Sequence, residues 1–101
     1  MDAFSKAVGE VLRDARRSCG MTLATVSVRS AGQFKASVLG GYERGEKKIS
    51  LDRFTALADL YGFPSYDLLA RVITLVASST ERRDEVIGLR AAEQEKRIMM
   101  D

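Results

Sequence analysis

The sequence predicts an all-α protein: a compact bundle of five short helices with an added C-terminal helical extension. Apolar residues recur at three- and four-residue spacing through most of the chain. Residues that cap helices and glycines that end them stand at the expected starts and stops. The chain has a single Pro, which suits helices joined by short turns.

The first helix is predicted from about Phe4 to Cys19, with Gly20 as its left-handed stop. The second helix should begin after Thr22, a good N-cap residue, and end near Ser30. Its β-branched residues also suit a strand, but the short length and the Thr cap favour a helix. The apolar residues of these two helices are Phe4, Ala7, Val8, Val11, Leu12, Ala15, Leu23, Val26 and Val28.

A third helix should span about Lys35 to Arg44, after a turn at residues 30–33 and before a stop at Gly45. Gly40 and Gly41 cost this helix about 1 kcal/mol each relative to Ala. Such a cost is accepted where another backbone approaches closely, or where a tight helix crossing needs small residues. The residues available to the core are Phe34, Val38, Leu39 and Tyr42.

The fourth helix is capped by Ser50 and ends at Gly62, and the fifth begins after Pro64. A break is expected at residues 78–80, followed by a sixth helix from about Glu81 to Arg97. The predicted buried residues are Leu51, Phe54, Leu57, Ala58, Tyr61, Leu68, Leu69, Val72, Ile73 and Val76.

Composition limits the class of protein. A chain of 101 residues has room for one compact domain. The single Cys19 excludes an internal disulfide framework and suits a reducing cytoplasm. No apolar run approaches the roughly 18 residues of a membrane span, and the N-terminus lacks the layout of a signal peptide. We therefore expect a cytoplasmic protein with no membrane partner.

The positive charge is concentrated in the first half of the chain. Residues 1–48 carry nine Lys and Arg against five Asp and Glu, a net charge of +4. Residues 49–101 carry seven against nine, a net charge of −2. A bias of this size also occurs on ordinary solvated faces, so it is only weak evidence for an anionic partner.

Enzyme chemistry is not expected. The chain has no His, and no Ser has a neighbouring base of the kind that activates a nucleophile. The run GGYERG lacks the strand and the Gly-Lys-Ser/Thr ending of a phosphate-binding loop. No metal or other cofactor is implied.

Three strings, LRDARRSCGMTL, YERGEKKISLDRFTALADLYGFP and SYDLLA, occur in the order and at the spacing of a known family. The sequence resembles the Xre-type helix-turn-helix family, the phage-repressor and Cro group, over about Ser5 to Ala70. Within it, SAGQFKASVLGGYERG is most similar to the N-terminal DNA-binding domain of an actinobacterial developmental regulator. The turn is about two residues longer than is common, so positions are counted back from Glu43.

The resemblance implies a DNA-binding domain at residues 1–70, with the third helix in the major groove of double-stranded DNA. It also implies an ion pair between Arg16 and Glu43, and a cytoplasmic, nucleoid-associated bacterial regulator. The implied base-facing residues are Gln33, Lys35, Ala36, Ser37, Gly40 and Gly41. The residues expected to face phosphates are Thr22, Arg44, Lys47 and Lys48.

Residues 71–101 form the extension, for which two uses stay open. Its apolar residues could form a homodimer surface, since the family usually reads palindromic sites as symmetric pairs, or could complete the monomer core. The candidate dimer residues are Val72, Ile73, Val76, Val86, Ile87 and Leu89. The main alternative to a transcriptional regulator is a protein-interaction module, antitoxin-like or adaptor-like, that uses this extension.

Overall fold

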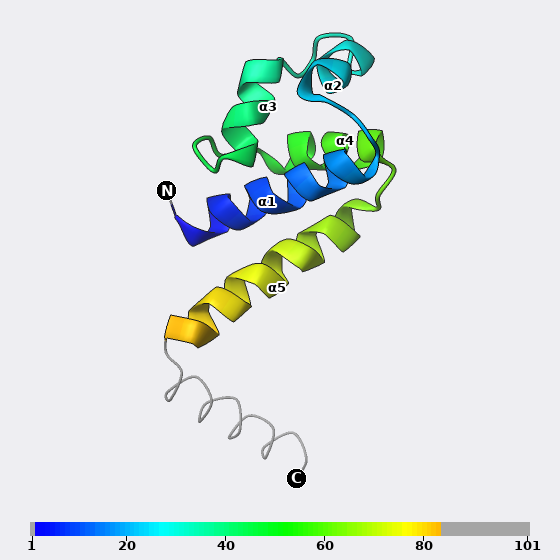
Figure 1. The fold of residues 1–101 in the computed structure, drawn as a ribbon. Coiled ribbons are helices and arrows are strands. Elements are labelled where there is room, and N and C mark those ends of the chain that lie inside the picture. The colour runs from blue at the N-terminus through cyan, green and yellow to red at the C-terminus, as the bar shows by residue number, and fades with distance from the viewer. Residues whose placement is uncertain (1, 84–101) are drawn as a thin grey trace.

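The computed structural model describes residues 2–83 and contains five α-helices (Figure 1). They are α1 (Ala3–Ser18), α2 (Leu23–Arg29), α3 (Ala36–Glu43), α4 (Leu51–Tyr61) and α5 (Ser65–Arg83). This part of the chain contains no strand, which confirms the predicted all-α class. None of its helices is long and apolar enough to cross a membrane.

Side-chain caps fix where three of the helices begin. The Asp2 carboxylate accepts a hydrogen bond of 2.7 Å from the Ser5 amide and caps α1. Thr22 and Ser50 cap α2 and α4 in the same way, by accepting from the third residue beyond each. At the end of α4, Gly62 adopts a φ of 80°, the left-handed stop that the sequence predicts.

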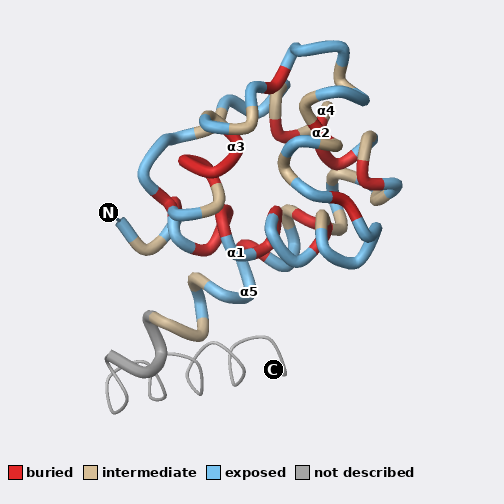
Figure 2. Tube along the Cα trace, turned by 45° about the horizontal axis from the view of Figure 1, so that its top comes forward, coloured by how far each residue is buried: buried red, intermediate tan, exposed pale blue. Residues whose placement is uncertain are grey.

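The core lies around α1, which contacts α3, α4 and α5, while α2 packs on α3 (Figures 1 and 2). The buried segments of these helices face one another, and the turns and outward-facing residues are mostly exposed. The largest fully buried side chains are Phe34, Leu12, Leu39, Leu57, Leu68, Val26 and Val72.

Helices α1 and α3 are in close backbone contact at Gly9, a residue that the sequence does not single out. A Cβ built on Gly9 of α1 would touch the Tyr42 carbonyl oxygen and lie 2.5 Å from that of Glu43. Only a residue without a side chain allows α1 and α3 to cross this closely. The close backbone contact expected at Gly40 and Gly41 is therefore found at Gly9 instead.

The predicted break at residues 78–80 is wrong. Helix α5 runs without interruption through Ser78, Ser79 and Thr80 to Arg83. The chain has neither Gly nor Pro between Pro64 and Gly88, and Ser and Thr alone reduce helix stability only slightly. The helix also continues across the expected domain boundary after Ala70. The rest of the predicted sixth helix lies outside the described residues.

Two predictions of burial are wrong. Leu51 is 69% exposed because it is the first residue of α4 and precedes the turn that reaches the core. Ile73 is 55% exposed, because it lies to one side of the helix face that carries Val72 and Val76 into the core.

Candidate nucleic-acid interface

The turn between α2 and α3 is held in an unusual backbone conformation. Ala31 has a φ of 53° and Gly32 a φ of 76°, so two successive residues are left-handed. For Ala31 this conformation costs about 1 kcal/mol. Ser30 stabilises the turn, since its hydroxyl donates to the Ser27 carbonyl and accepts from the Phe34 amide at 3.2 Å. The entry of the chain into α3 is therefore fixed locally.

Arg53 of α4 packs against α3 and the turn before it. The sequence analysis did not predict this role. Its guanidinium lies 5.1 Å from the centre of the Phe34 ring. The same group donates to the Tyr42 hydroxyl at 2.7 Å and to the Gln33 carbonyl at 3.4 Å. One side chain thus contacts the C-terminal end of α3 and the turn that leads into it. No spacing rule in the sequence links Arg53 to Phe34, because they meet only through the tertiary fold.

The outer face of α3 carries small side chains. Leu39 and Tyr42 are buried against the core, and a helical period places residues 36, 37, 40 and 41 on the opposite side. Ser37 is exposed and Ala36 is half-buried. Lys35 and Gln33, at the entrance to the helix, are both exposed. Four of the six predicted base-facing residues are therefore accessible together.

The other two, Gly40 and Gly41, are buried under basic side chains. A Cβ on Gly40 would lie 2.8 Å from a terminal nitrogen of Arg44. A Cβ on Gly41 would lie 3.0 Å from a carbon of the Lys47 stem. Side chains from beyond the helix therefore fill the space beside both glycines, whose assignment as base-facing residues stays a prediction.

The ion pair expected between Arg16 and Glu43 is present. The Arg16 Nε and NH2 atoms donate to the two Glu43 carboxylate oxygens at 2.7 and 2.9 Å. Its NH1 atom donates to the Met21 carbonyl at 2.8 Å. The side chains are only 11% and 8% exposed. The hydrogen bond to Glu43 raises the pKa of Arg16. The pair joins α1 to α3 and to the start of α2.

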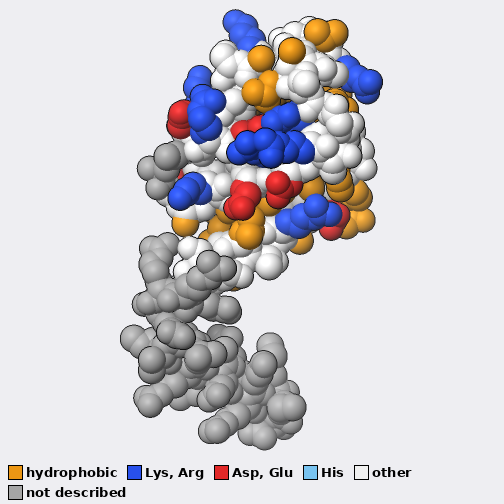
Figure 3. Space-filling model, viewed as in Figure 1, with side chains coloured by type: hydrophobic (Ala, Val, Ile, Leu, Met, Phe, Trp, Pro, Cys, Tyr) orange, Lys and Arg blue, Asp and Glu red, His pale blue; other side chains and the backbone are white. Residues whose placement is uncertain are grey.

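A basic hollow of about 300 Å³ lies between α1, α2 and α3. Arg13, Arg16 and Arg44 line it together with Leu23, Gly40 and Glu43. Basic side chains gather in the middle of this face in Figure 3. Arg44 is also held by Glu46, whose two carboxylate oxygens each accept from its Nε at 2.9 Å. This hydrogen bond raises the pKa of Arg44 and lowers that of Glu46.

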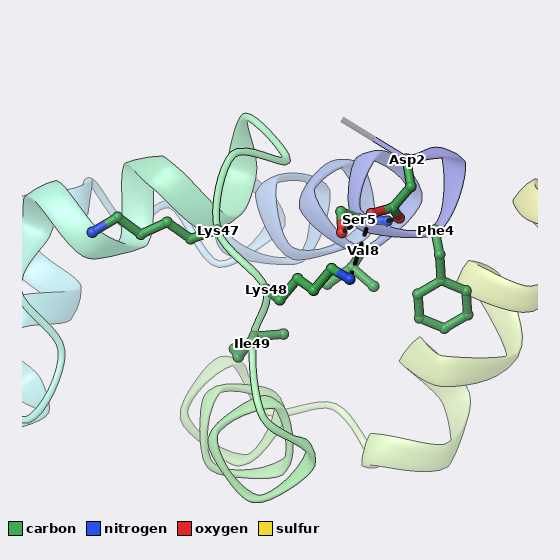
Figure 4. Close-up of a pocket in the computed structure, with 7 residues that line it drawn as sticks. All are labelled: Asp2, Phe4, Ser5, Val8, Lys47, Lys48 and Ile49. Carbon is green, nitrogen blue, oxygen red and sulfur yellow. Dashed lines mark hydrogen bonds and ion pairs between the residues drawn. The ribbon is translucent and has the colours of Figure 1, made fainter.

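The loop lysines Lys47 and Lys48 point in different directions (Figure 4). Lys48 extends toward Asp2, with 4.0 Å between its Nζ and a carboxylate oxygen, across a cavity of about 350 Å³. The Ser5 amide, and to a lesser degree Lys48, lower the pKa of Asp2. Lys47 extends alongside α3. Within residues 2–83, no three His, Cys, Asp or Glu side chains gather in a way that could hold a metal ion.

Three of the six candidate dimer residues lie within the described part of the chain. Val72 is fully buried and belongs to the monomer core, so its assignment to a dimer surface is wrong. Val76 is half-buried and packs against the same core. Ile73 is 55% exposed. The remaining candidates, Val86, Ile87 and Leu89, lie outside the described residues.

The model of a family described as a helix-turn-helix domain matches residues 7–72, which include all of α1 except its first turn, α2 to α4 and the start of α5. The chain belongs to the helix-turn-helix domain family. The resemblance read from the sequence is thereby confirmed. No match was found among curated proteins.

Solved structures of helix-turn-helix proteins resemble the chain closely. It is 39% identical to the DNA-binding domain of BldD from S. venezulae, with a TM-score of 0.63 over 66% of this chain and 97% of that one. A crystal structure of the BldD DNA-binding domain gives the same identity and TM-score. The clp gene regulator ClgR from Corynebacterium glutamicum is 24% identical, with a TM-score of 0.71 over 88% of this chain and 93% of that one. That last likeness shows a shared fold.

Proposed function

We propose that this protein is a sequence-specific DNA-binding transcriptional regulator that inserts α3 into the major groove and acts as a homodimer in the cytoplasm. The observation that carries the proposal is the arrangement around α3. This eight-residue helix exposes Ser37 and part of Ala36 near its start, and basic side chains from α1 and from the loop after α3 lie beside it and over Gly40 and Gly41. The 39% identity to the DNA-binding domain of BldD supports the same function.

Base recognition is assigned to the accessible residues at the start of α3. The Ser37 hydroxyl can donate or accept a hydrogen bond at a base edge, and the Ala36 methyl can contact a thymine methyl. Lys35 can reach guanine acceptors or a phosphate, and Gln33 can pair with adenine. Side chains this small let the helix lie deep in the groove, so that DNA shape and bridging water contribute to specificity.

Phosphate contacts are assigned to exposed groups on either side of α3. Thr22 stands at the start of α2, where free amide groups and the helix dipole attract an anion. Arg44 lies at the basic hollow, and Lys48 is 85% exposed. These groups supply charge without reading sequence. Arg16 is better placed to orient α3, because Glu43 and Met21 take up its donors.

The homodimer is assigned to the exposed side of α5. Symmetric regulators of this kind read two half-sites about one DNA turn apart. Ile73 is a large apolar residue exposed there, and the core of a homodimer interface is rich in apolar surface. Ile73→Asp should shift the protein from dimer to monomer in sedimentation velocity, whereas the same change at the exposed Thr74 should not. A dimer that survives Ile73→Asp would move the interface elsewhere.

The test of DNA recognition is selection of tight binders from randomised DNA duplexes at near-physiological salt. We expect enrichment of an inverted repeat, whose half-site spacing reports the dimer geometry. Affinity for the selected duplex should fall steeply as salt rises, because bound cations are released from the phosphates. Lys48→Ala should weaken binding to every sequence and flatten that dependence.

Two outcomes would contradict the proposal. If no sequence is enriched and only salt-sensitive binding remains, the chain is not a sequence reader. If Ser37→Ala leaves every base preference of the enriched site unchanged, α3 does not enter the groove as proposed. Ala77→Ser, on the exposed part of α5, is the matched control, since it adds a hydroxyl far from α3 and should change neither affinity nor preference.

A further inference from the structure

The loop after α3 folds back onto the helix at Gly41. Gly45 has a φ of 73°, which reverses the chain. The amide groups of Glu46 and Lys47 then donate hydrogen bonds to the Gly41 carbonyl oxygen at 2.9 and 3.3 Å. A Cβ on Gly45 would lie 3.1 Å from the Cα atom of Lys6, so α1 supports the turn from the other side. The backbone of Lys47 is therefore fixed relative to α3.

The stem of the Lys47 side chain occupies the space that a side chain at residue 41 would take. A Cβ on Gly41 would lie 3.0, 3.1 and 3.3 Å from the Cδ, Cγ and Cε atoms of Lys47. The glycine is buried beneath this stem, while Lys47 itself remains exposed. Figure 4 shows Lys47 extended alongside α3, whereas Lys48 points toward Asp2.

We propose that Lys47 is a specificity-determining residue that reaches a base edge from its seat on Gly41. This inference rests on the proposed DNA-binding function. Residues 37 and 41 are one helical turn apart on the outer face of α3, so the Lys47 stem adjoins the face that carries Ser37. An ammonium group on that face suits the O6 and N7 acceptors of guanine. Lys47 thus departs from the phosphate-facing role that the sequence predicts.

The packing of the Lys47 stem against α3 explains why residue 41 is a glycine. A Cβ there would approach the stem to 3.0 Å and displace it by a few tenths of an ångström, and a larger side chain would displace it further. Glycine lowers the stability of the helix, but it leaves room for the longer, charged side chain of Lys47 to pack against α3. Gly40 has a related arrangement, since a terminal nitrogen of Arg44 lies where its Cβ would point. That arginine lines the basic hollow and keeps its phosphate role.

The experiment measures base preference at each position of the selected half-site. It compares the wild-type chain, Lys47→Ala, Gly41→Ala and the matched control Lys48→Ala, each checked for folding by circular dichroism. Lys47→Ala should reduce discrimination for one guanine per half-site by about tenfold. Gly41→Ala should weaken the same preference although the lysine remains. Lys48→Ala should lower affinity for all sequences and leave the preferences unchanged.

The results separate this inference from the proposed function. If the wild-type chain enriches no sequence, both fail. If it enriches a site, but Lys47→Ala weakens every sequence equally, as Lys48→Ala does, then Lys47 contacts only phosphate and this inference alone is overturned. If Lys47→Ala changes the base preference and Gly41→Ala does not, then contact with Gly41 does not position Lys47 for base recognition.

Discussion

Replacing Gly9 by Ala should destabilise the protein although Ala is the better helix former. Gly9 lies in α1 where the backbone of α3 crosses it. An added Cβ would be 2.5 Å from the Glu43 carbonyl oxygen and 2.8 Å from its carbonyl carbon, against 3.4–4 Å for ordinary contact. Both partners are backbone, so no side chain can swing away, and the two helices must separate by about an ångström.

The magnitude follows from two opposing effects. Forcing extra volume into a packed contact costs about 1–3 kcal/mol, and the upper end applies where backbone meets backbone. Exchanging Gly for Ala inside a helix returns about 1 kcal/mol. The net loss in the free energy of unfolding is therefore about 2 kcal/mol, which for a domain of this size lowers Tm by roughly 10 °C.

The assay is urea unfolding followed by far-ultraviolet circular dichroism. Gly40→Ala is the matched control, since it makes the same exchange in a neighbouring helix but meets only the flexible end of Arg44. It should leave stability unchanged or raise it by up to about 1 kcal/mol. A Gly9→Ala protein at least as stable as the wild type would refute the close crossing of α1 and α3.

Three further predictions concern polar groups. Glu43→Leu, which leaves the Arg16 charge nearly buried, should cost about 3 kcal/mol in urea unfolding, and adding Arg16→Met should restore part of that loss. Tyr61→Phe should raise stability by about 1 kcal/mol, since the buried Tyr61 hydroxyl has no hydrogen-bond partner within residues 2–83. Asp2→Ala should lower Tm at pH 7. Because the folded-state pKa of Asp2 lies below its ordinary 3.8, this difference should be complete above about pH 4 and should be lost as the pH falls further, through the lower folded-state pKa.

The sequence predicts the helices well where their ends are chemically marked. Thr22, Ser50 and Gly62 cap or stop helices as expected, because each acts on backbone groups within three or four residues. The false break at residues 78–80 has the same origin. Ser and Thr are capping residues only where the chain turns, and no glycine or proline forces a turn there.

The candidate interface was predictable only as far as family resemblance or local spacing reaches. The Arg16–Glu43 pair joins residues 27 positions apart, and only the resemblance indicated it. The contacts of Arg53 and the crossing at Gly9 have no local signature, because both depend on how α1, α3 and α4 pack. The seating of Lys47 on Gly41 depends on the left-handed turn at Gly45, which a glycine permits but does not require.

These contacts together explain how a helix with so little intrinsic stability can serve as the proposed recognition element. An isolated helix of eight residues with two glycines would not form in water. Here α1 contacts its C-terminal end through Gly9 and Arg16, and Arg53 of α4 contacts Tyr42 near that end and Gln33 just before the helix begins. Since its position is fixed by its neighbours, α3 can give up side chains on its outer face. Charged groups from the following loop then occupy that face, so changes in the loop should alter base preference without altering the fold.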